Sequence, residues 1–190
     1  DEVNLEFIKE HNVAVVRRLT GGGAVYHDQG NLNFTFIFKN QKNCNYDFAR
    51  FMSPVVDALK RLGLPATIDG RNDITINGKK VSGNSQYRRK DRVIHHGTLL
   101  FDVNLDNLEK SLKVSRDKLS KRGVSSVRSR VINIRELLSS PPEMDEFKGL
   151  IKEALMLAFG GGQGDYCLIT ADLRRIEELK RDKYKSWNWN

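Results

Sequence analysis

The clearest alternation of apolar and polar positions falls in residues 32–38. The apolar positions are Leu32, Phe34, Phe36 and Phe38. Because the side chains of a strand point alternately to its two faces, this period of two predicts a β-strand with one strongly apolar face. An apolar run rich in valine at 13–16 predicts another strand, which leads directly into a glycine-rich loop.

Helical spacing replaces this alternation over residues 48–62. The apolar positions there are Phe48, Phe51, Met52, Val55, Val56, Leu59 and Leu62. This stripe predicts a core-facing helix that stops at Gly63, and Pro54 within it predicts a kink or a later start. Weaker patterns predict helices over residues 4–10, 105–112, 115–121, 134–138, 143–159 and 171–181.

Two hairpins are expected between residues 73 and 102. Residues 73–76 run into Asn77-Gly78, the pair best suited to a two-residue type I′ turn, and residues 79–83 return. The charged residues 88–92 predict a second turn before a strand at 93–102, and residues 166–170 form a late strand-like run. Hairpins mixed with helices predict an α+β fold with mixed or antiparallel sheets and flanking helices, rather than a doubly wound βαβ fold.

Composition narrows the class of protein. With 190 residues, 39% of them hydrophobic, the chain fits one domain with a core. No apolar run is long enough for a transmembrane helix, and no signal peptide is visible. Cys44 and Cys167 lie far apart without metal-ligand spacing, so reduced thiols in a cytoplasmic protein are expected. The net charge of +8 predicts an anionic partner: a nucleic acid, a nucleotide or an acidic protein surface.

A loop rich in arginine and glycine is the first candidate site. Arg17 and Arg18 precede three glycines at 21–23, and His27 follows them. Backbone N–H groups in such a turn can form a concavity for anions, and arginine supplies forked donors. We expect this loop to hold a nucleotide phosphate or an acid substrate, although a hairpin turn with surface arginines has the same pattern. Neither a Walker-type phosphate loop nor a Gly-x-Gly-x-x-Gly turn before a helix is present.

The hairpin around Lys80 is the second candidate site. Lys79 and Lys80 point to opposite faces, so only one of them can look into a site. An inward lysine beside the carboxylate of Asp73 would stabilise charge that develops during adenylation, whereas an exposed lysine pair is the simpler interpretation. His95 and His96 also project to opposite faces of a strand, so they cannot both bind one metal ion.

Together these residues resemble the bacterial lipoate–protein ligase A family. The similar segments, in chain order, are Arg-Arg-x-x-Gly-Gly-Gly-Ala-Val-Tyr-His-Asp at 17–28, Gly-Arg-Asn-Asp at 70–73, Lys-Val-Ser-Gly at 80–83, His-His-Gly-Thr-Leu-Leu at 95–100, Gly-Val-x-x-Val-Arg-Ser-Arg-Val at 123–131 and Trp-Asn-Trp at 187–189. Any one motif is weak, but their ordered combination is specific and extends over nearly the whole chain.

The resemblance implies an α+β catalytic domain over residues 1–190, related to biotin–protein ligases, and a two-step reaction. Lipoate and Mg²⁺-ATP give lipoyl-AMP and pyrophosphate, and the lipoyl group then passes to a lysine of a lipoyl domain. The implied acceptors are the E2 subunits of 2-oxoacid dehydrogenases and the glycine cleavage H protein, with no nucleic-acid or membrane partner. The family also has a further N-terminal segment and a C-terminal accessory domain. We expect both to be absent here, the latter beginning after about residues 186–190.

The resemblance also implies roles for individual residues. Lys80 is the catalytic lysine, which touches both the carboxyl oxygen and the α-phosphate. The implied ATP and adenylate site consists of Arg17, Arg18, Gly22, Gly23, Ala24, Val25, Tyr26, Asn72, Asp73 and Lys80. The implied lipoyl site consists of Arg18, Gly21, Gly22, His27, Lys80, Ser82, Gly83, His96, Gly97 and Thr98. Asp73 is the implied metal ligand. Asn84 departs from the family, which has a smaller residue after Ser-Gly.

Two other functions stay open at this point. An octanoyl or lipoyl transferase of the same fold would need no ATP, and one branch uses a cysteine nucleophile. Neither Cys44 nor Cys167 falls within the similar motifs, which favours the ligase. A basic nucleic-acid-binding module has only the charge in its support, because the basic run at 116–130 lacks aromatic residues that could stack on bases.

Overall fold

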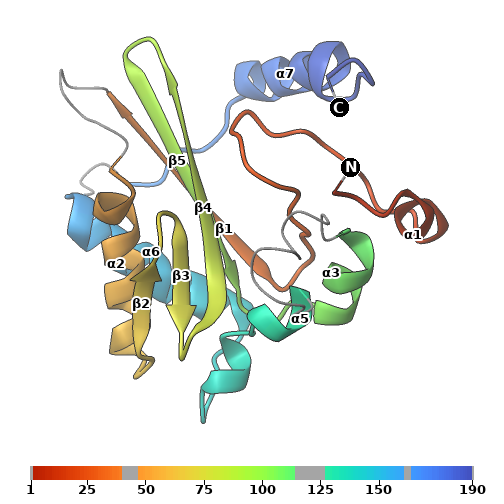
Figure 1. Ribbon diagram of the computed structural model, residues 1–190. Coiled ribbons are helices and arrows are strands. Elements are labelled where there is room, and N and C mark those ends of the chain that lie inside the picture. The colour runs from red at the N-terminus through yellow and green to blue at the C-terminus, as the bar shows by residue number, and fades with distance from the viewer. Residues whose placement is uncertain (1, 40–46, 114–126, 161–163, 190) are drawn as a thin grey trace.

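The computed structural model describes residues 2–39, 47–113, 127–160 and 164–189, and they form one antiparallel sheet with helices on both faces (Figure 1). The strands are β1 (Asn31–Lys39), β2 (Ala66–Asp69), β3 (Asp73–Ile76), β4 (Lys79–Arg89) and β5 (Arg92–Leu100). Their order across the sheet is β1-β5-β4-β3-β2, and each neighbouring pair is antiparallel. The α+β fold class is therefore confirmed.

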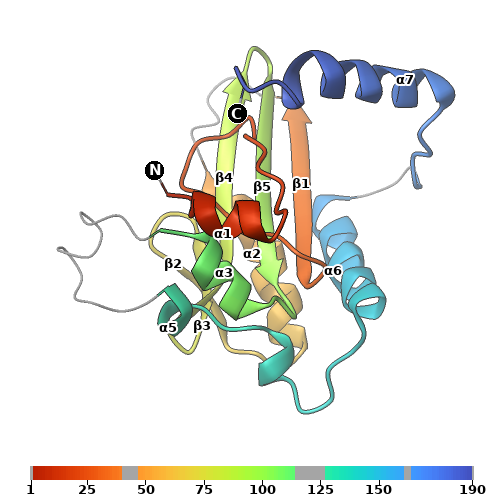
Figure 2. The same ribbon diagram turned by 90° about the vertical axis from the view of Figure 1, so that its right-hand side faces the viewer.

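Two long helices cover one face of the sheet, and shorter helices lie on the other (Figure 1, Figure 2). The long helices are α2 (Phe48–Arg61) and α6 (Met144–Phe159). The other face carries α1 (Leu5–Glu10), α3 (Leu105–Ser111), α5 (Val127–Arg130) and α7 (Thr170–Leu179). A 3-10 turn, η1 (Arg135–Leu137), precedes α6, and a π-helical turn, η2 (Lys180–Tyr184), follows α7.

The main core lies between the sheet and the two long helices. Met52, Val55 and Leu59 of α2 are fully buried there, as the helical stripe predicts. Phe34 is buried against them and Phe36 is partly buried, so the alternating strand turns its apolar face towards α2. Burial of these large side chains supplies most of the hydrophobic stabilisation of the sheet.

α2 keeps nearly its predicted bounds. The Asp47 side chain caps its first turn by accepting a hydrogen bond from the Arg50 amide at 3.0 Å. Gly63 follows the helix with a φ of 80°, the left-handed conformation that glycine tolerates. Pro54 lies inside the helix, so the predicted later start of this helix is wrong.

A second apolar cluster lies on the opposite face of the sheet. It contains Leu100, Val103 and Leu108, and Tyr26 and Val131 pack against it. β5 contributes to both clusters because neighbouring residues of a strand point to opposite faces. This cluster packs α3 and Tyr26, which follows the glycine-rich loop, against the sheet.

Several expected strands differ from the structure. Residues 13–16 and 166–170 form no strand, and β2 was not anticipated. Val15 and Val16 are exposed. A valine-rich run becomes a strand only where a neighbouring backbone pairs with it, and no strand pairs with this one among the described residues. β4 extends well past the predicted residue 83. The helix expected over 115–121 lies outside the described residues.

Two expectations from composition can also be compared with the structure. Within the described ranges, no helix combines the length and the apolar character that crossing a bilayer requires. Cys167 is an exposed free thiol, whereas Cys44 lies outside the described residues.

Gly30 is packed against the backbone that follows β5. Its carbonyl oxygen accepts hydrogen bonds from the amides of Phe101 (3.1 Å) and Asp102 (3.0 Å). A Cβ at position 30 would lie 1.9 Å from the Asp102 carbonyl oxygen, so only glycine fits without a backbone shift.

We therefore expect Gly30→Ala to lower the unfolding free energy by about 3 kcal/mol or more, because the backbone it would touch cannot rotate away. Gly149→Ala is the matched control, since nothing lies within 4 Å of that site in α6. It should stabilise the helix by roughly 0.5–1 kcal/mol. Denaturant unfolding of both variants is the measurement, and equal effects would contradict the steric argument.

His95 is a fully buried histidine in the main core. Its ring centroid lies 4.9 Å from that of Phe51 and 5.8 Å from that of Phe48. Desolvation, followed by the charge of His96, lowers the pKa of His95 from 6.5 to about 4. The unfolded chain therefore binds a proton in this pH range that the folded chain does not.

Acid should consequently destabilise the fold through His95. Stability is fully present above pH 6.5 and is lost as the pH falls towards 4, by up to about 3 kcal/mol at roughly 1.4 kcal/mol per pH unit. Unfolding free energies of the wild type and of His95→Gln, measured across this range, isolate the contribution. The wild type should lose more stability than the variant, and parallel curves would show that His95 does not titrate this way.

Candidate active site

The glycine-rich segment lies against the face of β4 and β5 that carries His96 (Figure 2). The Gly21 carbonyl oxygen accepts a hydrogen bond from the Ser85 hydroxyl on β4 at 3.0 Å and another from Arg18 Nη2 at 2.6 Å. Gly22 has a φ of 101°, and a Cβ there would lie 2.9 Å from Arg18 Nη2. The loop is thus folded around the Arg18 guanidinium and joined to the sheet.

Thr20 connects this loop to β5. Its buried hydroxyl accepts a hydrogen bond from Arg18 Nε at 3.0 Å and lies 2.5 Å from His96 Nε2. Desolvation, then the charges of Arg18 and His27, lower the pKa of His96, so its neutral ring can accept the hydroxyl proton. Desolvation and the charge of Arg18 lower the pKa of His27 as well. Two neutral imidazoles therefore lie near one fixed guanidinium at pH 7.

Glu2 places a carboxylate on the backbone of the loop. Its Oε2 accepts a hydrogen bond from the Ala24 amide at 2.7 Å, and a Cβ on Gly23 would lie 2.5 Å from the same oxygen. Burial lowers the pKa of Arg18, and the charge of Glu2 opposes this effect. The protein's own carboxylate therefore occupies part of the predicted anion concavity. Sequence reasoning missed Glu2 as a site residue, because no local spacing connects it to the loop.

Lys80 and Asp73 form an ion pair on the hairpin of β3 and β4. Lys80 Nζ lies 2.7 Å from Asp73 Oδ1, and each side chain is about one-third exposed, at 38% and 34%. The strand register shifts at Val81, which leaves this residue as a β-bulge. A Cβ on Gly83 would lie 3.1 Å from Lys80 Nζ, so the glycine leaves space beside the ammonium. Lys79 is exposed, and only one lysine of the pair meets the carboxylate, as predicted.

The ion pair and the glycine loop lie on the same face of β4. Gly83 adjoins Lys80, and Ser85 holds Gly21. Residues two apart on a strand share a face and lie about 7 Å from each other. Val131, the last residue of the motif at 123–131, forms a β-bridge with Lys80. The structure thus brings together segments from three separate parts of the chain.

The chemistry of this face suits two acidic groups held close together. Arg18 offers forked donors on a permanent charge, and Lys80 offers a compact positive charge. The glycine loop adds backbone amides, and the missing side chain of Gly83 allows a ligand to approach. Cations fixed in this way can overcome the repulsion between a carboxylate and a phosphate, which is what acyl activation requires.

Some residues of the expected sites direct their side chains elsewhere. Ser82 is fully buried, and its hydroxyl accepts a hydrogen bond from Asn84 Nδ2 at 3.1 Å. The space above Gly97 is occupied by Asn84 and Phe34. Tyr26 packs into the second apolar cluster, where desolvation is the main cause of its raised pKa. Any contact of these residues with a ligand stays a prediction.

The remaining expected residues lie around the loop and β5. Arg17 is exposed, and its carbonyl oxygen accepts a hydrogen bond from Trp189 Nε1 at 2.8 Å. Val25 is exposed as well. Thr98 pairs with Asn33 on β1, two residues beyond His96, and shares its face. Asn72 is hydrogen-bonded to Asn84 and immediately precedes the ion-paired Asp73.

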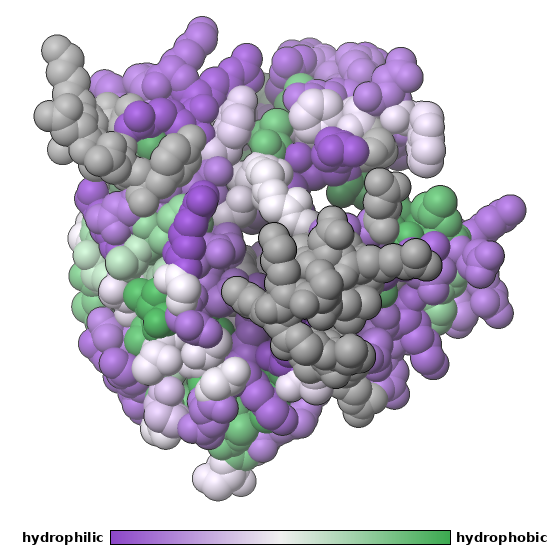
Figure 3. Space-filling model, in the orientation of Figure 1, coloured by the Kyte–Doolittle hydropathy of each residue, from purple (hydrophilic) through white to green (hydrophobic). Residues whose placement is uncertain are grey.

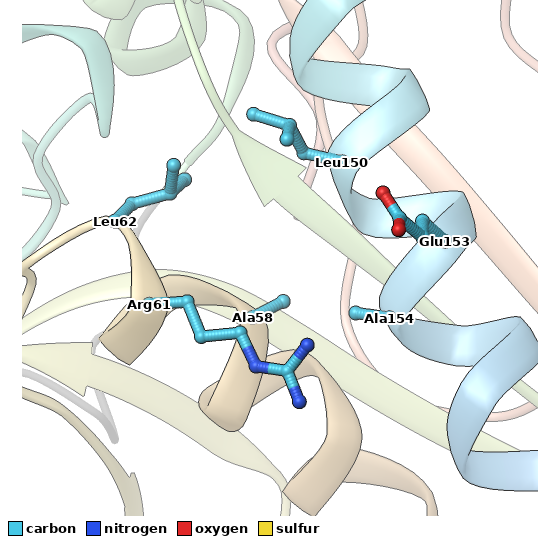
Figure 4. Close-up of a pocket in the computed structure, with 6 residues that line it drawn as sticks. All are labelled: Ala58, Arg61, Leu62, Leu150, Glu153 and Ala154. Carbon is cyan, nitrogen blue, oxygen red and sulfur yellow. The ribbon is translucent and has the colours of Figure 1, made fainter.

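In the part of the chain that the structure describes, no group of three or more His, Cys, Asp or Glu side chains is arranged to hold a metal ion. A shallow pocket lies between α2 and α6, on the opposite face of the sheet (Figure 4). Its lining residues are Ala58, Arg61, Leu62, Leu150, Glu153 and Ala154.

Hydrophilic side chains cover most of the described surface seen in Figure 3. The loop and the Lys80 hairpin form the better candidate site, because they bring Arg18, His96 and the Lys80–Asp73 pair to one face.

Comparison with known sequences gives a consistent set of relatives. The family model for the lipoyl protein ligase A/B catalytic domain matches residues 1–156. The chain is 42% identical over 191 residues to the lipoate-protein ligase LplJ of Bacillus subtilis and 45% identical over 191 residues to lipoate–protein ligase 1 of Staphylococcus aureus. These alignments cover 100% of this chain but 58% and 57% of the relatives. The chain therefore spans somewhat more than half the length of the curated relatives it matches.

Solved structures share the fold. A bipartite lipoate protein ligase from Thermoplasma acidophilum, described with its E2 lipoyl domain, superposes with a TM-score of 0.86 at 30% identity. That match covers 100% of this chain and 74% of the other. A lipoate-protein ligase A bound with ATP superposes with a TM-score of 0.83 at 27% identity, over 100% of this chain and 76% of the other.

Removal of the Glu2 carboxylate should loosen the loop. In Glu2→Ala the Ala24 amide loses a charge-assisted hydrogen bond worth about 1.5–3 kcal/mol, so its hydrogen exchange should accelerate roughly tenfold or more. Exchange mass spectrometry of peptides that cover residues 20–26 is the measurement. Glu6→Ala, which changes an exposed carboxylate in the first turn of α1, should leave the loop unchanged. Equal exchange in both variants would mean that the loop is held without Glu2.

Proposed function

Because the chain belongs to the family of lipoyl protein ligase A/B catalytic domains, we propose that it activates lipoate with ATP and transfers the lipoyl group to a protein lysine. The names of the relatives and the ATP-bound neighbour support both substrates. The observation that carries the proposal is the Lys80–Asp73 pair beside Gly83, on the same face of β4 as the loop that surrounds Arg18.

The first step joins two anions. A carboxylate oxygen of lipoate attacks the α-phosphorus of ATP, the bond from that phosphorus to the pyrophosphate oxygen breaks, and lipoyl-AMP forms. We assign Lys80 Nζ to the carboxyl oxygen and the α-phosphate together, where its charge offsets their repulsion as the new bond forms. Arg18 and the amides of the glycine loop hold the same two groups in position.

The second step forms the amide. The neutral amine of the acceptor lysine attacks the lipoyl carbonyl carbon, the bond to the AMP oxygen breaks, and the amine loses a proton as AMP leaves. The cations that held the adenylate also stabilise the departing phosphate. Lys80 and Arg18 therefore serve both steps without themselves forming a covalent bond.

Mg²⁺ fits this site as the counter-ion of ATP. Proteins commonly bind Mg²⁺ through one or two carboxylates together with substrate phosphates and water, so a full set of protein ligands is not needed. Asp73 is the carboxylate beside Lys80 and would share the ion with the phosphates. The ion would neutralise phosphate charge, while Lys80 remains the fixed cation of the protein.

For the acceptors, we propose the lipoyl domains of 2-oxoacid dehydrogenase E2 subunits and the glycine cleavage H protein. The description of the Thermoplasma acidophilum neighbour pairs that ligase with its E2 lipoyl domain, which supports the class of partner. The net charge of +8 would accelerate the encounter with an acidic partner and would make that encounter sensitive to salt.

Exchange of pyrophosphate into ATP, dependent on lipoate, tests the proposal in the full-length protein. Lys80→Ala should lower the exchange rate by about 100-fold or more, because one fixed donor to developing charge is lost. Lys79→Ala, which changes the exposed neighbour, should keep the wild-type rate.

Thermal unfolding of both lysine variants provides the control for folding, since a partly exposed ion pair contributes only about 1 kcal/mol or less. Exchange retained in Lys80→Ala would refute the role of Lys80. If the wild type shows no exchange of pyrophosphate into ATP but transfers octanoyl or lipoyl groups from an acyl carrier, it is a transferase instead.

A further inference from the structure

A chain of side-chain hydrogen bonds, buried where His95 meets Asn84, runs from the aromatic core to the segment that carries Asp73. It starts at Gln86, whose Nε2 donates to the Asp47 carbonyl oxygen (3.1 Å) and to His95 Nδ1 (2.9 Å). The bond to the Asp47 carbonyl orients the Gln86 amide with its N–H groups towards His95, so Nδ1 of the neutral ring accepts. The ring proton is accordingly assigned to Nε2, which donates to Asn84 Oδ1 at 3.3 Å. The proposed reaction uses neither His95 nor Asn84.

Asn84 and Asn72 are joined by hydrogen bonds in both directions. The Asn84 backbone amide donates to the Asn72 carbonyl oxygen at 2.8 Å, and Asn84 Nδ2 donates to the same oxygen at 3.1 Å. In return, Asn72 Nδ2 donates to the Asn84 carbonyl oxygen at 2.8 Å. Three hydrogen bonds therefore fix the residue directly before Asp73, and the Asp73 carboxylate holds Lys80 Nζ at 2.7 Å.

His95 fixes the orientation of the Asn84 amide. With Oδ1 towards His95, Nδ2 points to Asn72 and Ser82, and every donor has an acceptor. If the amide were turned over, Nδ2 would face the His95 N–H, and two donors would meet in a buried place. The histidine thus determines which end of the amide reaches Asn72.

Gly97 provides the space for this arrangement. It pairs with Asn84 across β4 and β5, and a Cβ there would lie 2.2 Å from Asn84 Oδ1 and 2.4 Å from Phe34 Cζ. A side chain at position 97 would displace Asn84 from its contacts. The asparagine and the glycine therefore form a matched pair on the core face of the sheet.

We propose that Asn84, oriented by His95, is a positioning residue that sets the place of Lys80 through Asn72 and Asp73. The proposal rests on the function assigned above to Lys80. Asn84 is 4% exposed and acts from the core face, so it does not touch the substrates. Its effect should therefore be on the rate of adenylation rather than on substrate binding.

Lipoate-dependent pyrophosphate exchange by Asn84→Leu in the full-length protein is the first test. Leucine has a similar size but neither donor nor acceptor, so kcat should fall about 10- to 100-fold while both KM values stay within about threefold. Val55→Ala, a change to a fully buried residue of α2, is the control for lost stability and should keep the wild-type kcat. A wild-type kcat in Asn84→Leu would overturn the proposal.

A double-mutant cycle separates positioning from general destabilisation. If Asn84 acts through Asp73, Asn84→Leu should lower kcat less than about threefold in an Asp73→Asn background. The same large loss in both backgrounds would show a purely structural role and would overturn the proposal. If Asn84→Leu fails to fold, as judged by circular dichroism, Asn84→Ser should give the same pattern, because serine is too short to reach both His95 and Asn72.

Acetylation of Lys80 by a soluble reagent, followed by mass spectrometry, tests the positioning without any enzyme assay. Lys80 should react several-fold faster in Asn84→Leu, because Asp73 no longer holds its ammonium, while Lys79 should react at an unchanged rate. An unchanged Lys80 rate would overturn the link. If the wild type shows no exchange of pyrophosphate into ATP, but Lys80 still reacts faster in Asn84→Leu, the proposed function is refuted and the positioning role stands.

Discussion

The alternation of side chains along β4 and β5 is the constraint on which both the core and the site depend. His95 enters the aromatic core, while His96, its neighbour, meets Thr20 of the glycine loop. On β4, the Asn84 side chain lies on the core face and is hydrogen-bonded to His95, whereas Ser85 lies on the other face and donates to Gly21 of the loop. A slip of one residue would exchange the two sets. The large side chains that fix the strand register therefore also fix the site.

The protein balances the cations of the site with its own carboxylates. Asp73 holds Lys80 at 2.7 Å, and the charge of Glu2 acts on Arg18. A partly exposed ion pair contributes about 1 kcal/mol or less to stability, so the Lys80–Asp73 contact is better explained by placement than by stabilisation. Side chains that are already oriented need little rearrangement when an anion arrives, and this is what makes fixed charges effective.

Local patterns in the sequence predicted the elements that local forces determine. The Asn77-Gly78 turn is confirmed, with φ values of 51° and 75° as a type I′ turn requires. The stripe of α2 and the alternation of β1 are confirmed because burial follows their periods. Both candidate segments of the site were recognised from their glycine and charge patterns, and they lie on one face.

Contacts between distant segments could not be read from local patterns. Glu2 is hydrogen-bonded to Ala24, and Asn84 to Asn72, but no repeating pattern in the sequence connects either pair. The run at 13–16 has strand-forming residues but no partner strand, so its apolar side chains stay exposed. These outcomes depend on which backbone lies alongside, and only the folded sheet determines that.

The two parts of the site, the glycine loop around Arg18 and the hairpin that carries Lys80, differ in how firmly they are held. Lys80 stands on a hairpin within the sheet, whereas hydrogen bonds with Ser85, His96, Glu2 and Trp189 hold the loop segment to the rest of the chain. Segments with few buried contacts open at lower free energy than core strands. The loop should therefore open at a lower free energy than the Lys80 hairpin. Val16 and Val25 are exposed along that same segment, so it joins apolar surface to charge, as a substrate with an apolar chain and an acidic head requires.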